Sequence, residues 1–204
     1  MAVLNVNPVD YDAWYDRHPD IYRAELEALA FFTRDYRNPM LEVGVGTGRF
    51  AAPLGVKYGI DPHGGMLSLA AGRGVEVVRG VGEMLPFKDA VFNMVLMVAT
   101  LSFVDNPGLV LREVRRVLVP GGGLVLAFIP RDSCFGRRYS EKFKGARFHS
   151  FGEVLSLLER TSFEVRGVKS TVVDGNVEAV FDGYVVGASF VVVCAHRRGT
   201  GSVF

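Results

Sequence analysis

The middle of the chain alternates short, almost entirely apolar runs with stretches that have the spacing of amphipathic helices. The expected strands lie at 40–43, 56–60, 75–79, 92–98 and 123–129, and the expected helices at 48–54, 62–72 and 107–118. Strands without a polar face are typical of a parallel sheet that helices cover on both sides. A repeated strand–helix order joins such strands by right-handed crossovers. The pattern therefore predicts an α/β fold with a doubly wound, mostly parallel sheet.

The C-terminal part of the chain has a different pattern. Residues 151–161 predict a helix with Ser150 as its N-cap. Two long strand-like runs follow at 163–173 and 184–195. Since no helix separates these runs, we expect them to pair antiparallel across residues 174–182.

The N-terminal residues 8–37 have helical spacing. Pro19 should divide them into two helices, because proline fits a first helical turn but not a helix interior. One helical face carries the aromatic residues Tyr11, Trp14, Tyr15 and His18. Aromatic faces attract cations, so this stripe is a candidate binding surface for a positively charged group. The alternative is a face that packs on the core.

The composition bounds the class of protein. The chain has 204 residues, enough for one domain, and is 49% hydrophobic with a formal net charge of +1. These values exclude a disordered chain, and the lack of a basic excess argues against a dedicated nucleic-acid binder. Its apolar runs are shorter than the about 18 residues of a membrane span, and its N-terminus lacks the pattern of a secretory signal. Cys134 and Cys194 lack metal-site spacing, so we expect two reduced thiols, no metal and a cytoplasmic protein.

A glycine-rich turn follows the first expected strand. Gly44, Gly46 and Gly48 allow a tight turn and a close approach of a ligand to the backbone. The third glycine of the dinucleotide-binding fingerprint would fall at position 49, which is Arg49, and the P-loop spacing is absent. The turn therefore predicts a ligand-binding loop, with an ordinary turn as the alternative.

Two carboxylates lie at the ends of the first two expected strands. Glu42, beside the loop, would oppose a diphosphate and favour a ligand with positive charge, such as S-adenosylmethionine with its ammonium and sulfonium. Its alternative role is to cap loop amides or to pair with an arginine. Asp61 follows Gly44 by 17 residues and can accept both ribose hydroxyls of a nucleoside. The alternative role of Asp61 is to cap the next helix.

Four segments match a known family in order and spacing. They are residues 41–50, 59–62, 79–87 and 118–123. Together they resemble the motifs of class I S-adenosylmethionine-dependent methyltransferases, specifically the small UbiE/type 11 group, over about residues 10–170. The resemblance implies S-adenosyl-L-methionine as cofactor and a Rossmann-like, doubly wound, seven-stranded sheet, mostly parallel with the last strand antiparallel.

The resemblance also implies roles for individual residues. Glu42 would lie near the methionine ammonium, Asp61 would hold the ribose, and Met66 would help to line the adenine. The implied cofactor-binding residues are Glu42, Gly44, Val45, Gly46, Gly48, Asp61, Pro62, Met66, Gly82, Glu83, Val98, Ala99 and Thr100. The chain departs from the family where Val81 replaces a frequent acidic contact to adenine, which would pass to Glu83 or the backbone. Asn93 replaces a frequent aspartate at the start of the fourth strand.

We expect a single methyltransferase domain. Its parts are an N-terminal helical lid (1–37), a cofactor-binding core (38–130), an Arg-rich insertion on the substrate side (131–149), and a C-terminal helix with an antiparallel strand pair (150–204). The lid and the insertion are left to recognise the substrate. The candidates are Tyr11, Trp14 and Tyr15 in the lid, and Arg131 and Arg138 in the insertion, because arginine pairs with carboxylate or phosphate through two hydrogen bonds. For the Arg-rich stretch 131–147, the alternative is a solvated surface segment.

Methyl transfer from a sulfonium depends mainly on proximity and alignment, which can supply up to about 7–11 kcal/mol of the barrier. A general base is needed only where the nucleophile arrives protonated. We therefore assign no catalytic residue and name His149, Asp132 and Tyr15 as candidates. His149 has a suitable unperturbed pKa of about 6.5, with a structural role as the alternative.

Our leading hypothesis is a methyltransferase that moves a methyl group in line to an N, O or C nucleophile of a small molecule. A nicotinamide-dependent oxidoreductase is one alternative, against which Glu42 and Arg49 argue. A non-catalytic S-adenosylmethionine-binding module is another. We expect no nucleic-acid substrate, because residues 98–101 lack the Asn/Asp-Pro-Pro-Tyr motif of related enzymes that methylate nucleic acids. A homodimer stays open.

Overall fold

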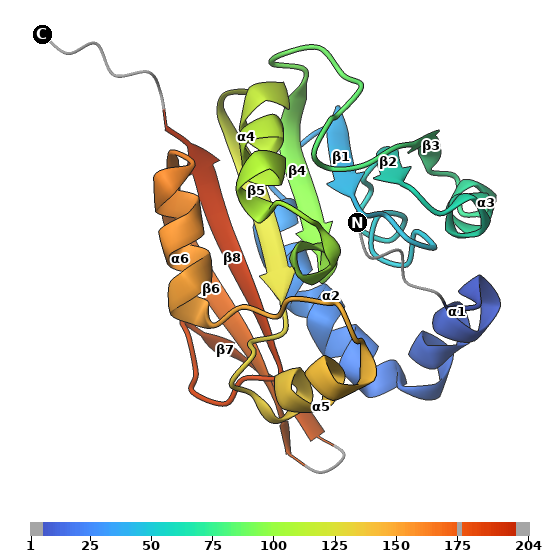
Figure 1. Ribbon diagram of the computed structural model, residues 1–204, viewed down its shortest axis with the longest axis vertical. Coiled ribbons are helices and arrows are strands. Elements are labelled where there is room, and N and C mark those ends of the chain that lie inside the picture. The colour runs from blue at the N-terminus through green and yellow to red at the C-terminus, as the bar shows by residue number, and fades with distance from the viewer. Residues whose placement is uncertain (1–5, 175–176, 199–204) are drawn as a thin grey trace, which may run out of the picture.

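The computed structural model describes residues 6–174 and 177–198, apart from the side chains of 174, 177 and 178 (Figure 1). The strands are β1 (Met40–Val43), β2 (Tyr58–Asp61), β3 (Glu76–Arg79), β4 (Phe92–Val98), β5 (Leu118–Phe128), β6 (Phe163–Asp174), β7 (Val177–Asp182) and β8 (Phe190–Arg197). The helices are α1 (Pro8–Arg17), α2 (Pro19–Thr33), α3 (Gly64–Gly72), α4 (Pro107–Val117), α5 (Cys134–Lys142) and α6 (Phe151–Arg160), with a short 3-10 helix η1 (Thr100–Phe103). None of the helices in these ranges is long and apolar enough to cross a membrane.

The sheet has a parallel part and an antiparallel part. β3, β2, β1, β4 and β5 are parallel neighbours in that order, and β8, β6 and β7 continue the sheet by antiparallel pairing. The chain moves from β1 to β2 on one side and later reaches β4 on the other, so the strand order reverses between β1 and β4. In open α/β sheets, ligands bind at such a point, beyond the carboxyl ends of the strands. The predicted class, a doubly wound α/β sheet that is mostly parallel, is confirmed.

The predicted count of seven strands is wrong, because residues 177–182 form an eighth. β7 pairs antiparallel with β6, with Lys169 opposite Asp182. It lies at the edge of the sheet, where charged residues are common, so its sequence has no continuous apolar run to reveal it. The expected antiparallel pairing of 163–173 with 184–195 is confirmed by β6 and β8. β8 begins only at Phe190, because Gly187 turns the chain with a φ of 84° shortly before it.

Two helix predictions need correction. Residues 48–54 form turns and no helix, since Pro53 has no N–H to donate to the carbonyl of Arg49. The hydroxyl of Tyr22 donates to that carbonyl instead. The polar stretch after β5 contains a helix that was not expected, α5, whose N-cap Ser133 accepts a hydrogen bond from the amide of Gly136 at 2.9 Å.

Other local predictions are confirmed. α1 and α2 are separate helices, and Pro19 stands at the first position of α2. Ser150 caps α6 in a capping box, because its amide donates to Glu153 and its side chain accepts from the Glu153 amide. Such a cap contributes about 1 kcal/mol and fixes where the helix begins.

Helices cover both faces of the sheet. In Figure 1, α4 and α6 lie in front of it and α2 lies behind it. α4 buries Val110, Leu111, Val114 and Val117 completely, at the spacing of one helical stripe. Burial of each such side chain contributes about 1.5–3 kcal/mol, which holds α4 on the sheet. α1 and α5 lie beyond the carboxyl ends of the parallel strands (Figure 1).

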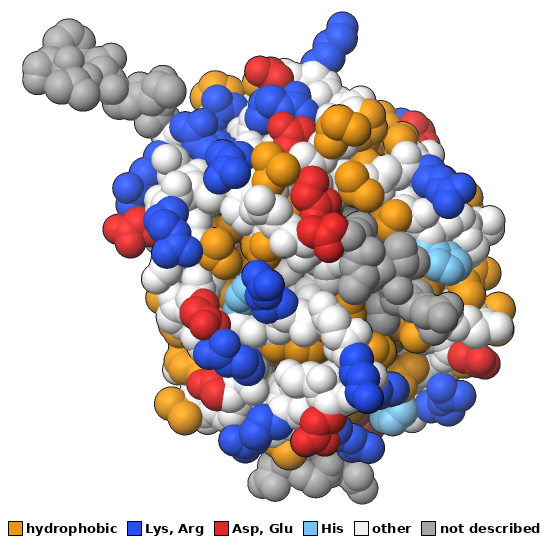
Figure 2. Space-filling view, viewed as in Figure 1, with side chains coloured by type: hydrophobic (Ala, Val, Ile, Leu, Met, Phe, Trp, Pro, Cys, Tyr) orange, Lys and Arg blue, Asp and Glu red, His pale blue; other side chains and the backbone are white. Residues whose placement is uncertain are grey.

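Charged side chains of both signs share the surface. On the face seen in Figure 2, red and blue side chains are interspersed, and the blue ones gather over the end of the molecule near the C-terminus. This mixture accords with the net charge of +1.

Candidate functional site

A cavity of about 400 Å³ lies at the carboxyl ends of the parallel strands. Its wall is formed by the glycine loop after β1, the end of β2, η1 after β4, and the helices α1, α2 and α5. It therefore lies at the reversal of strand order, where an open α/β sheet is expected to bind a ligand.

The glycine loop brings bare backbone to the cavity wall. Gly44, Gly46 and Gly48 have positive φ angles of 74°, 51° and 78°. A Cβ atom on Gly44 would lie 2.2 Å from Oγ1 of Thr100, so no side chain fits there. At Gly46 a Cβ atom would meet only the ring of Tyr11, at 3.9 Å. The loop and α1 thus lie next to each other in the cavity wall.

Asp61 joins this loop to the start of α3. Its Oδ2 accepts a hydrogen bond from the amide of Gly46 at 3.0 Å, and its Oδ1 accepts one from the amide of His63 at 2.8 Å. Burial raises the pKa of Asp61, although the two amide hydrogen bonds act in the opposite direction. The side chain lines the cavity, and a carboxylate oxygen can accept a further hydrogen bond beside the amide. The alternative role, capping the next helix, is wrong, because the N-cap of α3 is His63, whose side chain accepts from the amide of Met66. Asp61 instead holds the amides of Gly46 and His63, and its oxygens can accept further hydrogen bonds.

Glu42 lies behind the loop. Its side chain is 1% exposed and does not line the cavity. The Ala51 amide donates to its carboxyl group, but Oε2 has no hydrogen-bond partner among the described residues. Burial raises the pKa of Glu42 well above its usual range, and the charge of Asp61 raises it further. The structure thus favours a neutral Glu42 carboxyl, separated from the cavity by the loop.

The structure brings most of the predicted cofactor residues together. The cavity lining contains Gly44, Gly46, Asp61, Pro62, Met66, Val98, Ala99 and Thr100. The predicted residues outside the lining are Glu42, Val45, Gly48, Gly82 and Glu83. Gly82 packs between β1 and α4, where a Cβ atom would lie 3.1 Å from Val43 and Val110. Glu83 accepts a hydrogen bond from the amide of Asp105 at 2.9 Å, in the loop before α4.

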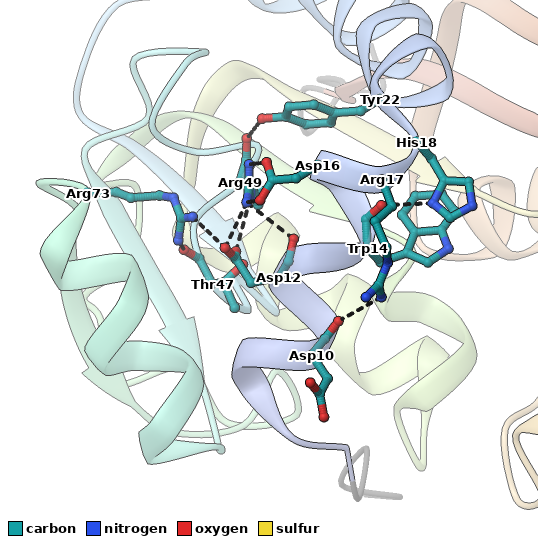
Figure 3. A network of polar contacts seen from close by, with 10 residues as sticks. All are labelled: Asp10, Asp12, Trp14, Asp16, Arg17, His18, Tyr22, Thr47, Arg49 and Arg73. Atoms are coloured by element: carbon teal, nitrogen blue, oxygen red, sulfur yellow. Dashed lines mark hydrogen bonds and ion pairs between the residues drawn. The ribbon is translucent and has the colours of Figure 1, made fainter.

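Ion pairs hold α1 against the loop (Figure 3). Arg49 donates to both oxygens of Asp12, at 2.9 and 2.8 Å, and to both oxygens of Asp16, at 2.9 and 2.7 Å. Arg73, at the end of α3, donates to Asp12 at 2.7 Å and to the carbonyl of Thr47 at 2.8 Å. Burial acts to raise the pKa of Asp12, but hydrogen bonds led by those from Arg49 outweigh it and lower the pKa to about 2.

We call this network of Asp12, Asp16, Arg49 and Arg73 the α1 latch. This network was not predicted, although the sequence carries two signals of it. Asp12 and Asp16 are four residues apart on one helix, and Arg49 replaces the third glycine of the dinucleotide fingerprint.

The predicted aromatic stripe packs on the core and also lines the cavity. Tyr15 is buried and packs edge-on against Phe50, with ring centroids 5.6 Å apart, yet it also lines the cavity. The Tyr11 and Tyr15 hydroxyl oxygens lie 2.9 Å apart. Burial raises the pKa of Tyr11 to about 12, so both phenols are neutral at physiological pH. Trp14 also lines the cavity and stacks on His18, with ring centroids 4.4 Å apart.

A second group of aromatic residues lines the cavity and was not predicted. Tyr139 and Phe143 of α5, Phe103 of η1 and Phe148 line the cavity. Neighbouring rings lie edge-on, with centroids 5.7 Å apart for Tyr139 and Phe143 and 5.8 Å apart for Phe103 and Phe143. Glu25 of α2 also lines the cavity. The available signal was the spacing of Tyr139 and Phe143, which places them on one face of a helix.

The remaining predicted residues lie outside the cavity lining. His149 is buried, burial lowers its pKa, and its Nε2 has no hydrogen-bond partner among the described residues. Arg131 donates to Glu153 at 3.1 Å. Asp132 and Arg138 are also absent from the lining, to which the Arg-rich stretch contributes Lys142 as its basic side chain.

The chain is similar to several known proteins. Residues 41–126 match the family described as "Methyltransferase domain". An uncharacterized protein of Mycobacterium tuberculosis is 40% identical over 91% of this chain and 70% of its own length. One of Methanocaldococcus jannaschii is 39% identical over 84% of each chain. The crystal structure of a SAM-dependent methyltransferase of Thermotoga maritima, described as a possible histamine N-methyltransferase, is 36% identical, with a TM-score of 0.86 over 93% of this chain and 95% of that one.

Proposed function

We propose, on the premise that this chain belongs to the S-adenosylmethionine-dependent methyltransferases, that it transfers the methyl group of that cofactor to a small molecule held in the aromatic cavity. When bound, the cofactor supplies an electrophilic methyl group on a sulfonium. The residues of this chain bind and align the two reactants, and alignment is the main requirement of such a transfer.

The observation that carries the proposal is the position of Asp61. It lies at the end of β2, reaches the amide of Gly46, and faces the cavity beside the glycine loop. Its two oxygens each hold one amide and retain capacity for a ribose hydroxyl. Gly46 offers backbone without a side chain at the same wall, and Pro62 and Met66 add apolar surface next to it. These residues fit a nucleoside-bearing cofactor.

The size of the cavity limits the acceptor. About 400 Å³ is near the lower end of the roughly 300–1,000 Å³ found for ligand pockets. Because the cavity has to hold the reacting parts of cofactor and acceptor together, we infer a small acceptor. Its nucleophile is a nitrogen, oxygen or carbon atom, and the description of the Thermotoga maritima protein makes amines one class to test.

Calorimetry with S-adenosylhomocysteine tests cofactor binding. The wild-type protein should bind it and should not bind NAD. Asp61→Ala should weaken binding by roughly 1–3 kcal/mol, the scale for hydrogen bonds that a charged group makes. Asp89→Ala is the matched control, because Asp89 is exposed and pairs with Arg116. Equal affinity of wild type and Asp61→Ala would remove Asp61 from the site.

Turnover separates an enzyme from a binding module. The wild-type protein should form S-adenosylhomocysteine when supplied with S-adenosylmethionine and a panel of small amines, phenols and enolisable carbonyl compounds. Tight cofactor binding without turnover on any member of the panel would favour the non-catalytic module.

A further inference from the structure

Helix α1 forms part of the cavity wall but packs little against the rest of the protein. Tyr11, Trp14 and Tyr15 line the cavity, yet Tyr15 is the one buried side chain within Pro8–Arg17. The next helix, α2, buries Ala24, Ala28, Leu29 and Thr33. Because buried apolar surface is the main attachment between packed elements, α1 depends more than α2 on contacts of another kind.

Those contacts are the ion pairs of the α1 latch, and Asp12 stands at their centre (Figure 3). Both of its oxygens accept hydrogen bonds from Arg49, which follows the glycine loop, and Oδ2 also accepts one from Arg73 at the end of α3. Arg73 in turn donates to the carbonyl of Thr47, within the loop, at 2.8 Å. Asp12 therefore joins α1, the glycine loop and α3 at one point.

We propose that Asp12 is a positioning residue that holds α1 against the cofactor site, and that the cofactor enters and its product leaves when the ion pairs of Asp12 open. This inference rests on the proposed function. The neighbouring Tyr11 places its ring next to Gly46, so α1 and the loop together enclose a ligand that lies on this backbone. His18 and Pro19 form the junction of the two helices, about which α1 can turn while α2 stays packed on the sheet.

The α1 latch suits such a movement because its strength comes from charge. The side chains of Asp12 and Arg49 are 15% and 16% exposed and that of Arg73 is 28% exposed, so water reaches each of them. When the ion pairs separate, the charged groups regain hydration, which offsets part of the attraction that is lost. α1 can therefore open without unfolding the sheet.

The rates of ligand binding distinguish this role from a purely structural one. If a ligand binds after α1 opens, more frequent opening speeds both its association and its release, and the two changes largely cancel in the Kd. Damage to the shape of the site instead speeds release and leaves association unchanged or slower. An increase in both rate constants is therefore the result specific to a latch.

Surface plasmon resonance on the immobilised full chain measures both rate constants, with S-adenosylhomocysteine as the probe. Asp12→Asn removes the charge and keeps the size of the side chain, so association and release should each become at least about fivefold faster, with the Kd within about threefold. Asp20→Asn is the matched control, because Asp20 pairs with Arg23 at an exposed site of α2 and lies outside the cavity lining. It should change neither rate constant.

Salt tests the same latch in the wild-type protein and depends on no variant. S-adenosylhomocysteine carries one ammonium and one carboxylate group at neutral pH, so salt has little effect on its own attraction to the protein. Raising NaCl from about 0.1 M to about 1 M shortens the screening length from about 10 Å to about 3 Å. Both rate constants of the wild type should rise at least about twofold, and those of Asp12→Asn should rise less.

The outcomes separate this inference from the proposed function. Failure of the wild-type protein to bind S-adenosylhomocysteine would overturn the proposed function. If that ligand binds but Asp12→Asn leaves its association unchanged or slower, the latch does not control access to the site, and this inference fails while the proposed function stands. Wild-type rate constants that do not rise with salt would overturn the inference as well.

Discussion

Glu42 holds a carboxyl group that the folded protein buries without a partner for one oxygen. Its pKa in the folded state is raised by burial, above the unfolded value of about 4.3. The native state therefore keeps a proton that the unfolded state releases as the pH increases. Burial of the neutral Glu42 carboxyl therefore costs the folded protein no deprotonation below about pH 4.3, where both states hold the proton. This advantage is lost as the pH rises through the pKa of Glu42 in the folded protein.

Glu42→Gln removes this titration. We expect its free energy of unfolding, relative to wild type, to increase between about pH 4 and pH 8, because only the wild-type protein loses the stabilisation that depends on the proton. Urea denaturation of both proteins at the two pH values measures the difference. Glu159→Gln, on the exposed part of α6, is the control and should show no such increase. A difference between Glu42→Gln and wild type that is the same at both pH values would contradict the neutral carboxyl.

Gly44 is a residue whose identity the structure requires. Gly44→Ala should lower the free energy of unfolding for two reasons. An alanine with a positive φ costs about 1–2 kcal/mol, and the overlap of its Cβ atom with Thr100 costs about 1–3 kcal/mol. Gly55→Ala is a matched control, because Gly55 has a φ of 69° and nothing within 4 Å of its Cβ position. In denaturant titrations, Gly44→Ala should lose more stability than Gly55→Ala by the overlap cost. Equal losses would show that Thr100 moves away at no cost.

Site residues that lie at or just after an expected strand could be predicted from the sequence. Site residues that reach the cavity only through the packing of helices could not. Gly44, Gly46 and Asp61 follow strand ends at fixed spacing, and the structure places all three at the cavity. Glu25 has no such signal, because it reaches the cavity only through the packing of α2 against the sheet. Glu42 has the spacing of a site residue, but its burial behind the loop depends on the turns that follow.

At the scale of elements, α1 is joined to the glycine loop by the α1 latch. Arg49 and Asp12 are 16% and 15% exposed, so their pairing is only partly screened by water. Lysine keeps the charge of Arg49 but cannot bridge two carboxylates with a planar fork. Arg49→Lys should therefore loosen α1 more than it loosens the sheet.

Hydrogen exchange measures this effect by segment. Arg49→Lys should speed exchange in residues 8–17 and cost about 1–3 kcal/mol of local stability, less than the loss of a fully buried pair. Arg23→Lys is the control, because Arg23 pairs with Asp20 at an exposed site and should matter little. Equal acceleration of α1 and β4 in Arg49→Lys would mean that the latch acts on the whole fold.

The α1 latch should also resist acid. Hydrogen bonds from arginine lower the pKa of Asp12 to about 2 against the opposing effect of burial, from an unfolded value of about 3.9. Its stabilisation is present above the unfolded pKa and is lost as the pH falls through about 2. Protection factors for amide hydrogen exchange in residues 8–17 report on this helix without using Trp14, whose ring stacks on His18. These protection factors should hold steady from about pH 7 to pH 4 and fall below that. A change between about pH 7 and pH 5 would contradict the assignment.

Elements were predictable where periodicity and caps agreed. Ser150 and Pro19 fix the starts of α6 and α2 by local chemistry, and both predictions are confirmed. The helix expected over 48–54 fails at Pro53, which removes one backbone donor. α5 was missed because its sequence is largely polar. β7 was missed because Glu178 and Asp182 interrupt its apolar residues, although it pairs with β6, the strand that precedes it in the chain.

At the scale of the whole molecule, the class of the sheet could be predicted from the sequence, whereas the walls of the cavity could not. β4 and the second half of β5 are almost continuous apolar runs, so the α/β class can be predicted from the pattern of residues along the chain. The cavity is assembled from α1, α2, η1 and α5, which only the tertiary fold brings together. Its aromatic walls come from residues more than a hundred positions apart, such as Tyr15 and Tyr139, and no local pattern connects them.

Ligand binding should therefore stabilise the molecule as a unit, because the proposed cofactor site joins the loop after β1, the end of β2 and the helix α1. S-adenosylhomocysteine at about 100 times its Kd should add about 2.7 kcal/mol. For a chain of this size, that corresponds to a rise in Tm of roughly 5–11 °C in scanning calorimetry. Asp61→Ala at the same ligand concentration should show a smaller rise, and NAD should give none. A rise of equal size in wild type and Asp61→Ala would mean that the ligand binds without the carboxylate that faces the cavity, and the site would have to be sought elsewhere on the sheet.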